Sequence, residues 1–298
     1  MPFIQLRDIP VNYQIYNAES ASETIVLIHG LGLNLEIWEP ILPFIKEHYR
    51  VVLLDLRGHG LTERGDVPLS WELFTEDLLM LLTKLELGPV HLLGHGFGAS
   101  LAVKFSIEHA ELVKSLVLLS TPAFLPRKTV ASIIQGRKQL ISKGNMLNLA
   151  ESLVNGIFKL TEEHALYRKI IAGYMAVSPE TYFDTFELYG ETPVNEDFAR
   201  LAHPTLTLIG SEDSISLTSN ALSSQLLMHS SVVVVPSATN TLFIDQPQFT
   251  FERIREFIID PSQVATDYAS FECHVAKYVM QYFNEAFEQV LNKKAVQA

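Results

Sequence analysis

The chain has 298 residues, of which 48% are hydrophobic and 19% are charged, a composition typical of globular proteins and not of disordered or fibrous ones. The formal net charge is −12 and no block of Lys and Arg occurs, so we expect no nucleic-acid partner. The single cysteine, Cys273, excludes a disulfide within the chain. No stretch reaches the ~18 apolar residues of a membrane span. We therefore expect a cytoplasmic protein with no membrane partner.

The first residues and the alternating elements after them predict a mostly parallel sheet. Residues 3–16 alternate in polarity around Asp8-Ile9-Pro10, which predicts an antiparallel hairpin at a sheet edge. Short apolar runs then alternate with helical patterns, which is typical of a doubly wound α/β sheet. We expect buried strands at 24–30, 50–56, 89–94, 114–120, 204–210 and 231–236, and helices near 35–48, 70–86, 97–109, 216–228 and 246–259, with Ser70 as a helix N-cap.

A long helical interval interrupts this alternation. Residues 122–203 show helical periodicity, no convincing strand and many large side chains. An insertion of this kind after a central strand predicts a helical cap over the carboxyl edge of the sheet, where open α/β sheets bind ligands. We expect most of its aromatic residues to form the core of the cap and a few to face the crevice. The remaining segments, 1–121 and 204–260, form the predicted core.

The tail, residues 261–298, adds an element that one sheet domain does not need. Its apolar residues recur at steps of three and four, which predicts an amphipathic helix. An isolated helix of this length is marginal in water, so the apolar face must pack against something. Docking on the body of the same chain is the commoner outcome, and a homodimer through this helix is the alternative. The periodic residues are Phe271, Val275, Val279, Tyr282, Phe283, Ala286 and Val290.

Five short motifs occur in a fixed order along the predicted core. They are HGLG (29–32), DLRGHGLT (55–62), GHGFG (94–98), GSED (210–213) and PSATNTLFIDQP (236–247), and each follows a predicted strand. With these motifs the chain resembles capped proteins of the α/β-hydrolase-fold superfamily from about residue 3 to residue 259. The resemblance implies a nucleophile, an acid and a histidine in that chain order.

Carried over by position, the resemblance places a catalytic residue type at only one of three positions. The nucleophile position is Gly96, the acid position is Asp213, and the histidine position is Asn240. Glycine has no atom with which to attack, and an amide cannot accept a proton near neutral pH. Removing the nucleophile or the base from a triad lowers turnover by a factor on the order of 10⁶. Ordinary serine-hydrolase chemistry is therefore not expected.

Other parts of the implied site remain. The backbone amides of Leu31 and Phe97 match the oxyanion hole, and Asn240 can donate a hydrogen bond to Asp213. Gly96 suits the strained turn, because glycine tolerates such backbone conformations. We place His95 with Leu31 and Phe97 as a ligand contact. We do not expect it to act as a base, because adjacent residues at a strand end tend to point to different sides.

The remaining titratable groups offer few alternatives. His29 and His59 belong to the motifs, and we expect them to brace loops; Asp213 is the better candidate to activate water or abstract a proton. The histidines are scattered and no HExxH, CxxC or phosphate-binding glycine motif occurs, so we expect no metal and no cofactor.

Four functions stay open at this point. The first is a non-hydrolytic protein that binds a small, largely apolar ligand under its cap. The second is a lyase, isomerase or other cofactor-free enzyme that uses Asp213 and the oxyanion amides. The third is a structural or signalling protein that works through its cap and tail, and the fourth is an atypical or inactivated ester hydrolase.

Overall fold

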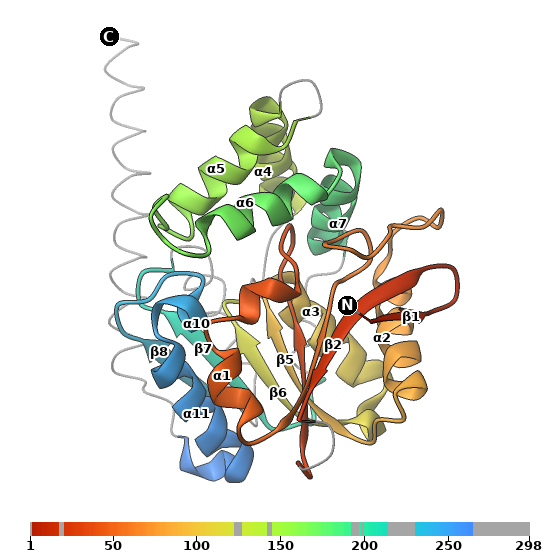
Figure 1. Ribbon diagram of the computed structural model, residues 1–298, viewed down its shortest axis with the longest axis vertical. Helices are drawn as coiled ribbons and strands as arrows, with labels where there is room; N and C mark the ends of the chain where they lie inside the picture. The colour runs from red at the N-terminus through yellow and green to blue at the C-terminus, as the bar shows by residue number, and fades with distance from the viewer. Residues whose placement is uncertain are drawn as a thin grey trace.

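The computed structural model describes residues 2–17, 21–121, 127–141, 145–191, 197, 200–213 and 230–264. Its centre is an eight-stranded sheet in the order β1-β2-β4-β3-β5-β6-β7-β8 (Figure 1). β1 and β2 form an antiparallel hairpin, β2 is antiparallel to β4, and all other neighbours are parallel. The edge hairpin and the mostly parallel sheet are confirmed. The strands are β1 (Phe3–Gln5), β2 (Pro10–Tyr16), β3 (Thr24–Ile28), β4 (Arg50–Leu54), β5 (Val90–His95), β6 (Val113–Leu119), β7 (Thr205–Gly210) and β8 (Ser230–Val235).

Helices cover both faces of the sheet (Figure 1). One face carries α1 (Leu42–Lys46) and α11 (Pro247–Ile259), which contact each other, and the other carries α2 (Trp71–Lys84) and α3 (Phe97–Glu108). Ser70 caps α2 as expected, because its Oγ accepts a hydrogen bond from Leu73 N at 3.2 Å. The smaller helices are η1 (Leu35–Trp38), η2 (Ala110–Leu112), α10 (Leu242–Asp245) and η3 (Pro261–Gln263).

The prediction of a single helix near 35–48 is wrong, because the segment forms two separate short helices, η1 and α1. Pro40 lies between them and lacks a backbone N–H, and Pro43 occupies the first turn of α1. Proline is tolerated in a first turn but breaks a helix in its interior, so the helix cannot run through this segment.

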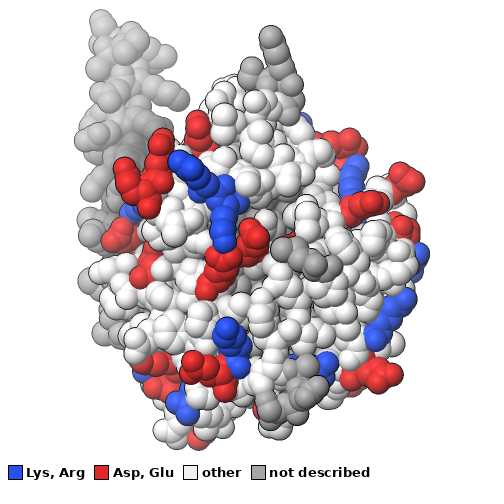
Figure 2. Space-filling model, in the orientation of Figure 1, with Lys and Arg blue, Asp and Glu red and all other residues white. Residues whose placement is uncertain are grey.

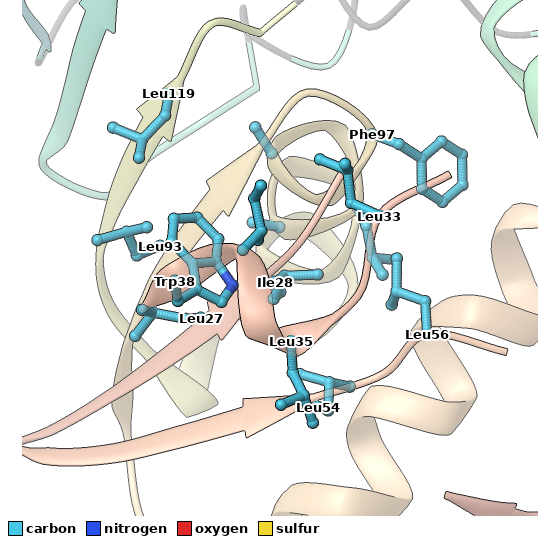
Figure 3. Close-up of a cluster of buried hydrophobic side chains, with 14 of the residues drawn as sticks. Leu27, Ile28, Leu33, Leu35, Trp38, Leu54, Leu56, Leu93, Phe97 and Leu119 are labelled. Carbon is cyan, nitrogen blue, oxygen red and sulfur yellow. The ribbon is translucent and has the colours of Figure 1, made fainter. Parts of the chain in front are cut away.

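The core packs where the carboxyl ends of the strands meet the loop after β3. Leucine and isoleucine side chains from β3 to β6 surround Trp38, which is fully buried (Figure 3). The Trp38 ring lies 4.6 Å from the Phe243 ring, and the His95 ring lies 5.1 Å from the same phenylalanine. The carboxyl edge of β5 therefore rests directly on the hydrophobic core. Besides Trp38, Figure 3 labels Leu27, Ile28, Leu33, Leu35, Leu54, Leu56, Leu93, Phe97 and Leu119.

Within the described ranges, four helices lie between β6 and β7 and stand over the carboxyl edge of the sheet (Figure 1). They are α4 (Arg127–Leu140), α5 (Leu147–Gly156), α6 (Tyr167–Ala176) and α7 (Pro179–Glu191), and we call them the cap. Arg64 ties the cap to the core through ion pairs with Glu180 (2.8 Å) and Asp184 (2.5 Å). Trp71 Nε1 adds a 3.1 Å hydrogen bond to the carbonyl oxygen of Leu188.

Two predicted elements lie outside the described residues. They are the helix at 216–228 and the amphipathic helix of the tail, with its periodic apolar residues from Phe271 to Val290. On the face shown in Figure 2, acidic and basic side chains are interspersed. No helix in the described ranges is long and apolar enough to cross a bilayer.

Candidate functional site

The centre of the site is the turn between β5 and α3, which we call the elbow. Gly96 lies there with φ +53° and ψ −113°, a conformation that favours glycine. A Cβ at this position would approach only Gly30 Cα (3.9 Å) and Tyr189 Oη (4.0 Å). The elbow therefore has room for a side chain, and the residue that occupies its centre provides none.

The glycines on either side of Gly96 allow the strand and the helix to pack closely. A Cβ on Gly94 would lie 2.4 Å from Ala99 N, and a Cβ on Gly98 would lie 2.2 Å from the carbonyl oxygen of Ile28. Real Cβ atoms do not approach backbone atoms this closely. Both glycines are thus required for the strand and helix to meet at this angle.

The two residues whose amides are expected to form the oxyanion hole line one cavity. Leu31 and Phe97 both line it, and Phe97 is the first residue of α3, so its N–H has no acceptor within the helix. The N-terminus of a helix also carries partial positive charge. A carbonyl or carboxylate oxygen placed against these amides would be stabilised.

Asn240 and Asp213 meet as expected. Asn240 Nδ2 donates a hydrogen bond to Asp213 Oδ2 at 3.2 Å. The loop that carries Asn240 is fixed by Asp245, whose carboxylate accepts hydrogen bonds from the backbone N–H and the hydroxyl of Thr239, both at 2.7 Å. Asp213 is buried and does not line the described cavity, whereas Asn240 does. A ligand in the cavity would therefore contact Asn240 and not Asp213.

His95 is one of the residues that line the same cavity, as its placement as a ligand contact predicts. The expectation that it points to a different side from the elbow centre is wrong, because its Nε2 lies 3.0 Å from Oδ1 of Asn240, another lining residue. Asn240 donates its amide N–H to Asp213, so its amide oxygen is the atom that faces His95. The Nε2–H of His95 is therefore the donor in this hydrogen bond. Alternation along the strand failed as a guide because Gly96 turns the chain sharply after β5. Burial lowers the pKa of His95, so the ring is neutral near pH 7.

His29 and His59 brace loops, as expected. His29 Nε2 accepts a hydrogen bond from Leu56 N (2.9 Å), and His59 Nδ1 donates one to the carbonyl oxygen of Arg57 (3.0 Å). Burial lowers the pKa of His29 to about 4, and burial together with the neighbouring His29 lowers that of His59 to about 3. Both rings are therefore neutral and structural.

A cavity of about 150 Å³ lies between the elbow and the cap. Its floor comes from the loop after β3, the elbow and the ends of β6 and β8, and its roof comes from α4 to α7. Five aromatic residues of the cap, named at the end of this paragraph, line the cavity. Met175, another large side chain of the cap, is exposed to solvent instead. The lining residues are Gly30, Leu31, Leu33, His95, Gly96, Phe97, Ser120 and Asn240 in the floor, and Ile133, Arg137, Leu153, Ile157, Phe158, Tyr174, Tyr182, Phe186 and Tyr189 in the roof.

Two polar side chains among the lining residues were not found by sequence reasoning. Ser120 follows β6 with φ +47°, and its buried Oγ has no hydrogen-bond partner among the described residues. Arg137 comes from the inner face of α4. Neither belongs to a motif, and only the folded chain brings them to the elbow. Across the described ranges, no group of three or more metal-ligating side chains occurs.

Comparison with known proteins agrees with this architecture. Residues 23–140 match the family model for the alpha/beta hydrolase fold. Pimeloyl-[acyl-carrier protein] methyl ester esterase of Aeromonas hydrophila is 28% identical over 78% of this chain and 94% of its own length. (E)-2-((N-methylformamido)methylene)succinate hydrolase of Acinetobacter baylyi is 22% identical over 78% of this chain and 89% of its own.

Solved structures show the same likeness over most of the chain. The enol-lactonase from Burkholderia xenovorans LB400 superposes with a TM-score of 0.78, at 20% identity, over 87% of this chain and all of its own. A hydrolase from Pseudomonas aeruginosa gives the same TM-score at 23% identity, over 86% of this chain and 97% of its own. With the sheet order, the elbow and the inserted cap, these matches make the chain an α/β-hydrolase-fold protein.

Proposed function

We propose that this protein binds a small, largely apolar ligand in the cavity under its cap without hydrolysing it. The observation that carries the proposal is Gly96 at the centre of the elbow, where a Cβ would meet no atom closer than 3.9 Å but no nucleophilic atom is present. The cavity around it is lined mostly by aromatic and aliphatic residues, among them the two whose amides the resemblance assigns to an oxyanion hole. These are the features of a binding site rather than of acyl transfer.

Asn240 supports the same proposal. Its amide satisfies the carboxylate of Asp213 and the imidazole of His95 at once, and it cannot take up a proton. The curated relatives described above are named as hydrolases and esterases. The proposal of a different role for this chain rests on its own residues at positions 96 and 240.

A fluorophosphonate probe tests the proposal, since it phosphonylates activated serines. We expect no stoichiometric labelling of the native chain, detected by intact-mass measurement. The Gly96→Ser/Asn240→His variant should acquire labelling if the elbow and amides are still aligned. Stoichiometric labelling of Ser120, or of another serine at the cavity, in the native chain would overturn the proposal.

A second candidate function rests on His95. Its Nδ1 is buried without a hydrogen-bond partner in the described structure, and because Nε2 carries the proton, Nδ1 carries a lone pair. A neutral imidazole beside the vacant centre of the elbow could activate water, or abstract a proton in a lyase or isomerase reaction. His95 suits this role better than Asp213, because His95 lines the cavity and Asp213 does not. The two functions differ in one result: only the second requires turnover that His95→Gln removes.

The proposed setting is the cytoplasm, which the single cysteine supports. A homodimer through residues 261–298 remains a prediction. Size measurement of the full chain and of a chain ending after Val264 tests it, because Val264 is buried and belongs to the body. A monomer in both cases would contradict the dimer.

A further inference from the structure

The cap helix α4 has two faces with different surroundings. Ile133 and Arg137, one turn apart, line the cavity above the elbow. Val130, Ile134 and Lys138 line an open groove on the outside of the cap, between α4 and α7. Residues four apart lie on the same side of a helix, so α4 presents a cation to each of two separate spaces.

The guanidinium of Arg137 is held in a fixed orientation. Its Nη1 donates a hydrogen bond to Tyr182 Oη at 2.6 Å. Its central carbon lies 4.6 Å from the centre of the Phe186 ring and 5.9 Å from that of Tyr182. Stacking on aromatic faces keeps the planar group flat and reduces the conformational freedom that it would lose on binding a ligand.

Most of the donors of Arg137 are unused. A guanidinium carries five N–H groups, and within the described chain only Tyr182 accepts from this one. No described carboxylate lies within 4.0 Å of it, whereas the buried Arg57 pairs with both Asp8 and Asp77. Arg137 is also the only Lys, Arg, Asp or Glu among the described residues that line the cavity. The cavity therefore has an uncompensated positive charge at its roof.

We propose that Arg137 binds the carboxylate of the ligand, and that the ligands of this cavity are small organic acids with an apolar, ring-sized body. This inference rests on the proposed function and names its ligand class. A guanidinium and a carboxylate form two parallel charge-assisted hydrogen bonds, which no neutral analogue reproduces. The volume of about 150 Å³ suits a single ring, since an apolar cavity of about this size accommodates benzene.

The orientation of the ligand follows from the two ends of the cavity. Arg137 belongs to the cap, and the amides of Leu31 and Phe97 belong to the floor. The carboxylate lies under α4 and the apolar body extends toward the elbow, between the rings of Tyr174 and Tyr189. Burial raises the pKa of both tyrosines, so their hydroxyls remain protonated and add no negative charge against an acid.

Benzoate and benzamide test this inference, because they have the same shape and differ in charge. Their dissociation constants are measured by calorimetry on the full chain near pH 7. Benzoate should bind at least about tenfold more tightly than benzamide. Arg137→Gln should weaken benzoate binding about tenfold to a hundredfold and leave benzamide binding unchanged. Arg137→Lys keeps the positive charge but cannot form two parallel hydrogen bonds to a carboxylate. Its affinity for benzoate should therefore lie between those of the native chain and Arg137→Gln.

Lys138→Gln is the matched control, since it removes the same charge from the other face of α4. It should leave the preference for benzoate intact. Equal affinity for benzoate and benzamide, or equal losses in the Arg137→Gln and Lys138→Gln variants, would overturn the inference while the proposed binding function stands. Preference for benzoate together with hydrolysis of methyl benzoate would overturn the non-hydrolytic function and leave the inference in place. Failure to bind either compound would overturn both.

Discussion

The side chains of His95 and Asn240 are hydrogen-bonded to each other, with 3.0 Å between Nε2 and Oδ1. Asn240 is bonded in turn to Asp213, so an imidazole, an amide and a carboxylate form one chain of contacts beside the elbow. The imidazole comes from the residue next to Gly96 and not from the loop after β8. The site thus contains a histidine at a position where the resemblance to hydrolases does not place one.

Asn240→Ala should lower the pKa of His95 further. Burial is the main cause that depresses this pKa, and the hydrogen bond to Asn240 opposes it by stabilising the protonated ring. The imidazole pKa can be followed by NMR titration. His91, whose pKa burial also lowers, lies on β5 away from the elbow and provides an internal control in the same spectra. A His95 pKa that stays constant or rises in the variant would contradict the hydrogen-bond assignment.

The stability of the fold should fall between pH 7 and pH 5 because of buried neutral histidines. Burial holds the pKa of His59 at about 3 in the folded chain, whereas an exposed histidine has a pKa of 6.5, so between these values the unfolded chain binds a proton that the folded chain does not. Stability from His59 is fully present above the unfolded pKa and is lost as the pH falls toward the folded one. The loss amounts to about 2 kcal/mol over these two units.

His59→Asn tests this dependence, because its amide can donate to Arg57 but does not titrate. Urea unfolding at pH 7 and pH 5 should show a smaller fall in the variant than in the native chain. Equal falls in both proteins would show that His59 is protonated in the folded state.

Gly98→Ala should destabilise the elbow by about 3 kcal/mol or more, because its methyl group would overlap the Ile28 carbonyl and force strand and helix apart. Gly88→Ala is the control, since a Cβ there meets no atom within 4 Å, and its effect should stay within about 0.5 kcal/mol. Thermal unfolding of both variants measures the difference. A Gly98→Ala variant as stable as Gly88→Ala would refute the packing role of the glycine.

Arg57→Ala should destabilise the fold by about 3–5 kcal/mol. Its fully buried guanidinium bonds to Asp8 and Asp77, and its loss leaves the mostly buried Asp77 without a cation. Arg7→Ala removes an exposed pair with Glu76 and should change stability by no more than about 1 kcal/mol. Denaturant midpoints compare the two, and similar effects would show that burial does not matter here.

Periodicity and turn residues predicted the sheet and the elbow, because strands buried on both faces are continuous apolar runs and a glycine pair marks the sharp turn. The resemblance, carried over by position, placed Gly96, Asp213 and Asn240, of which Gly96 lies more than 100 residues before the other two. The break between η1 and α1 was also readable, since Pro40 and Pro43 stand within the expected helix.

The contacts made by side chains across the site could not be predicted. The direction of His95 depends on the backbone angles of Gly96, and the inward turn of Arg137 depends on how α4 packs against α7. The polar spacing of α4 is compatible with either face turned inward. The cation of the cavity is therefore visible only in the folded chain.

Hydrolysis of p-nitrophenyl acetate by the full chain decides whether the elbow is catalytically inactive. We expect no burst and a rate indistinguishable from that of the heat-denatured protein, because the elbow has no nucleophile. Turnover above that background, abolished by His95→Gln, would contradict this prediction and would assign water activation to His95.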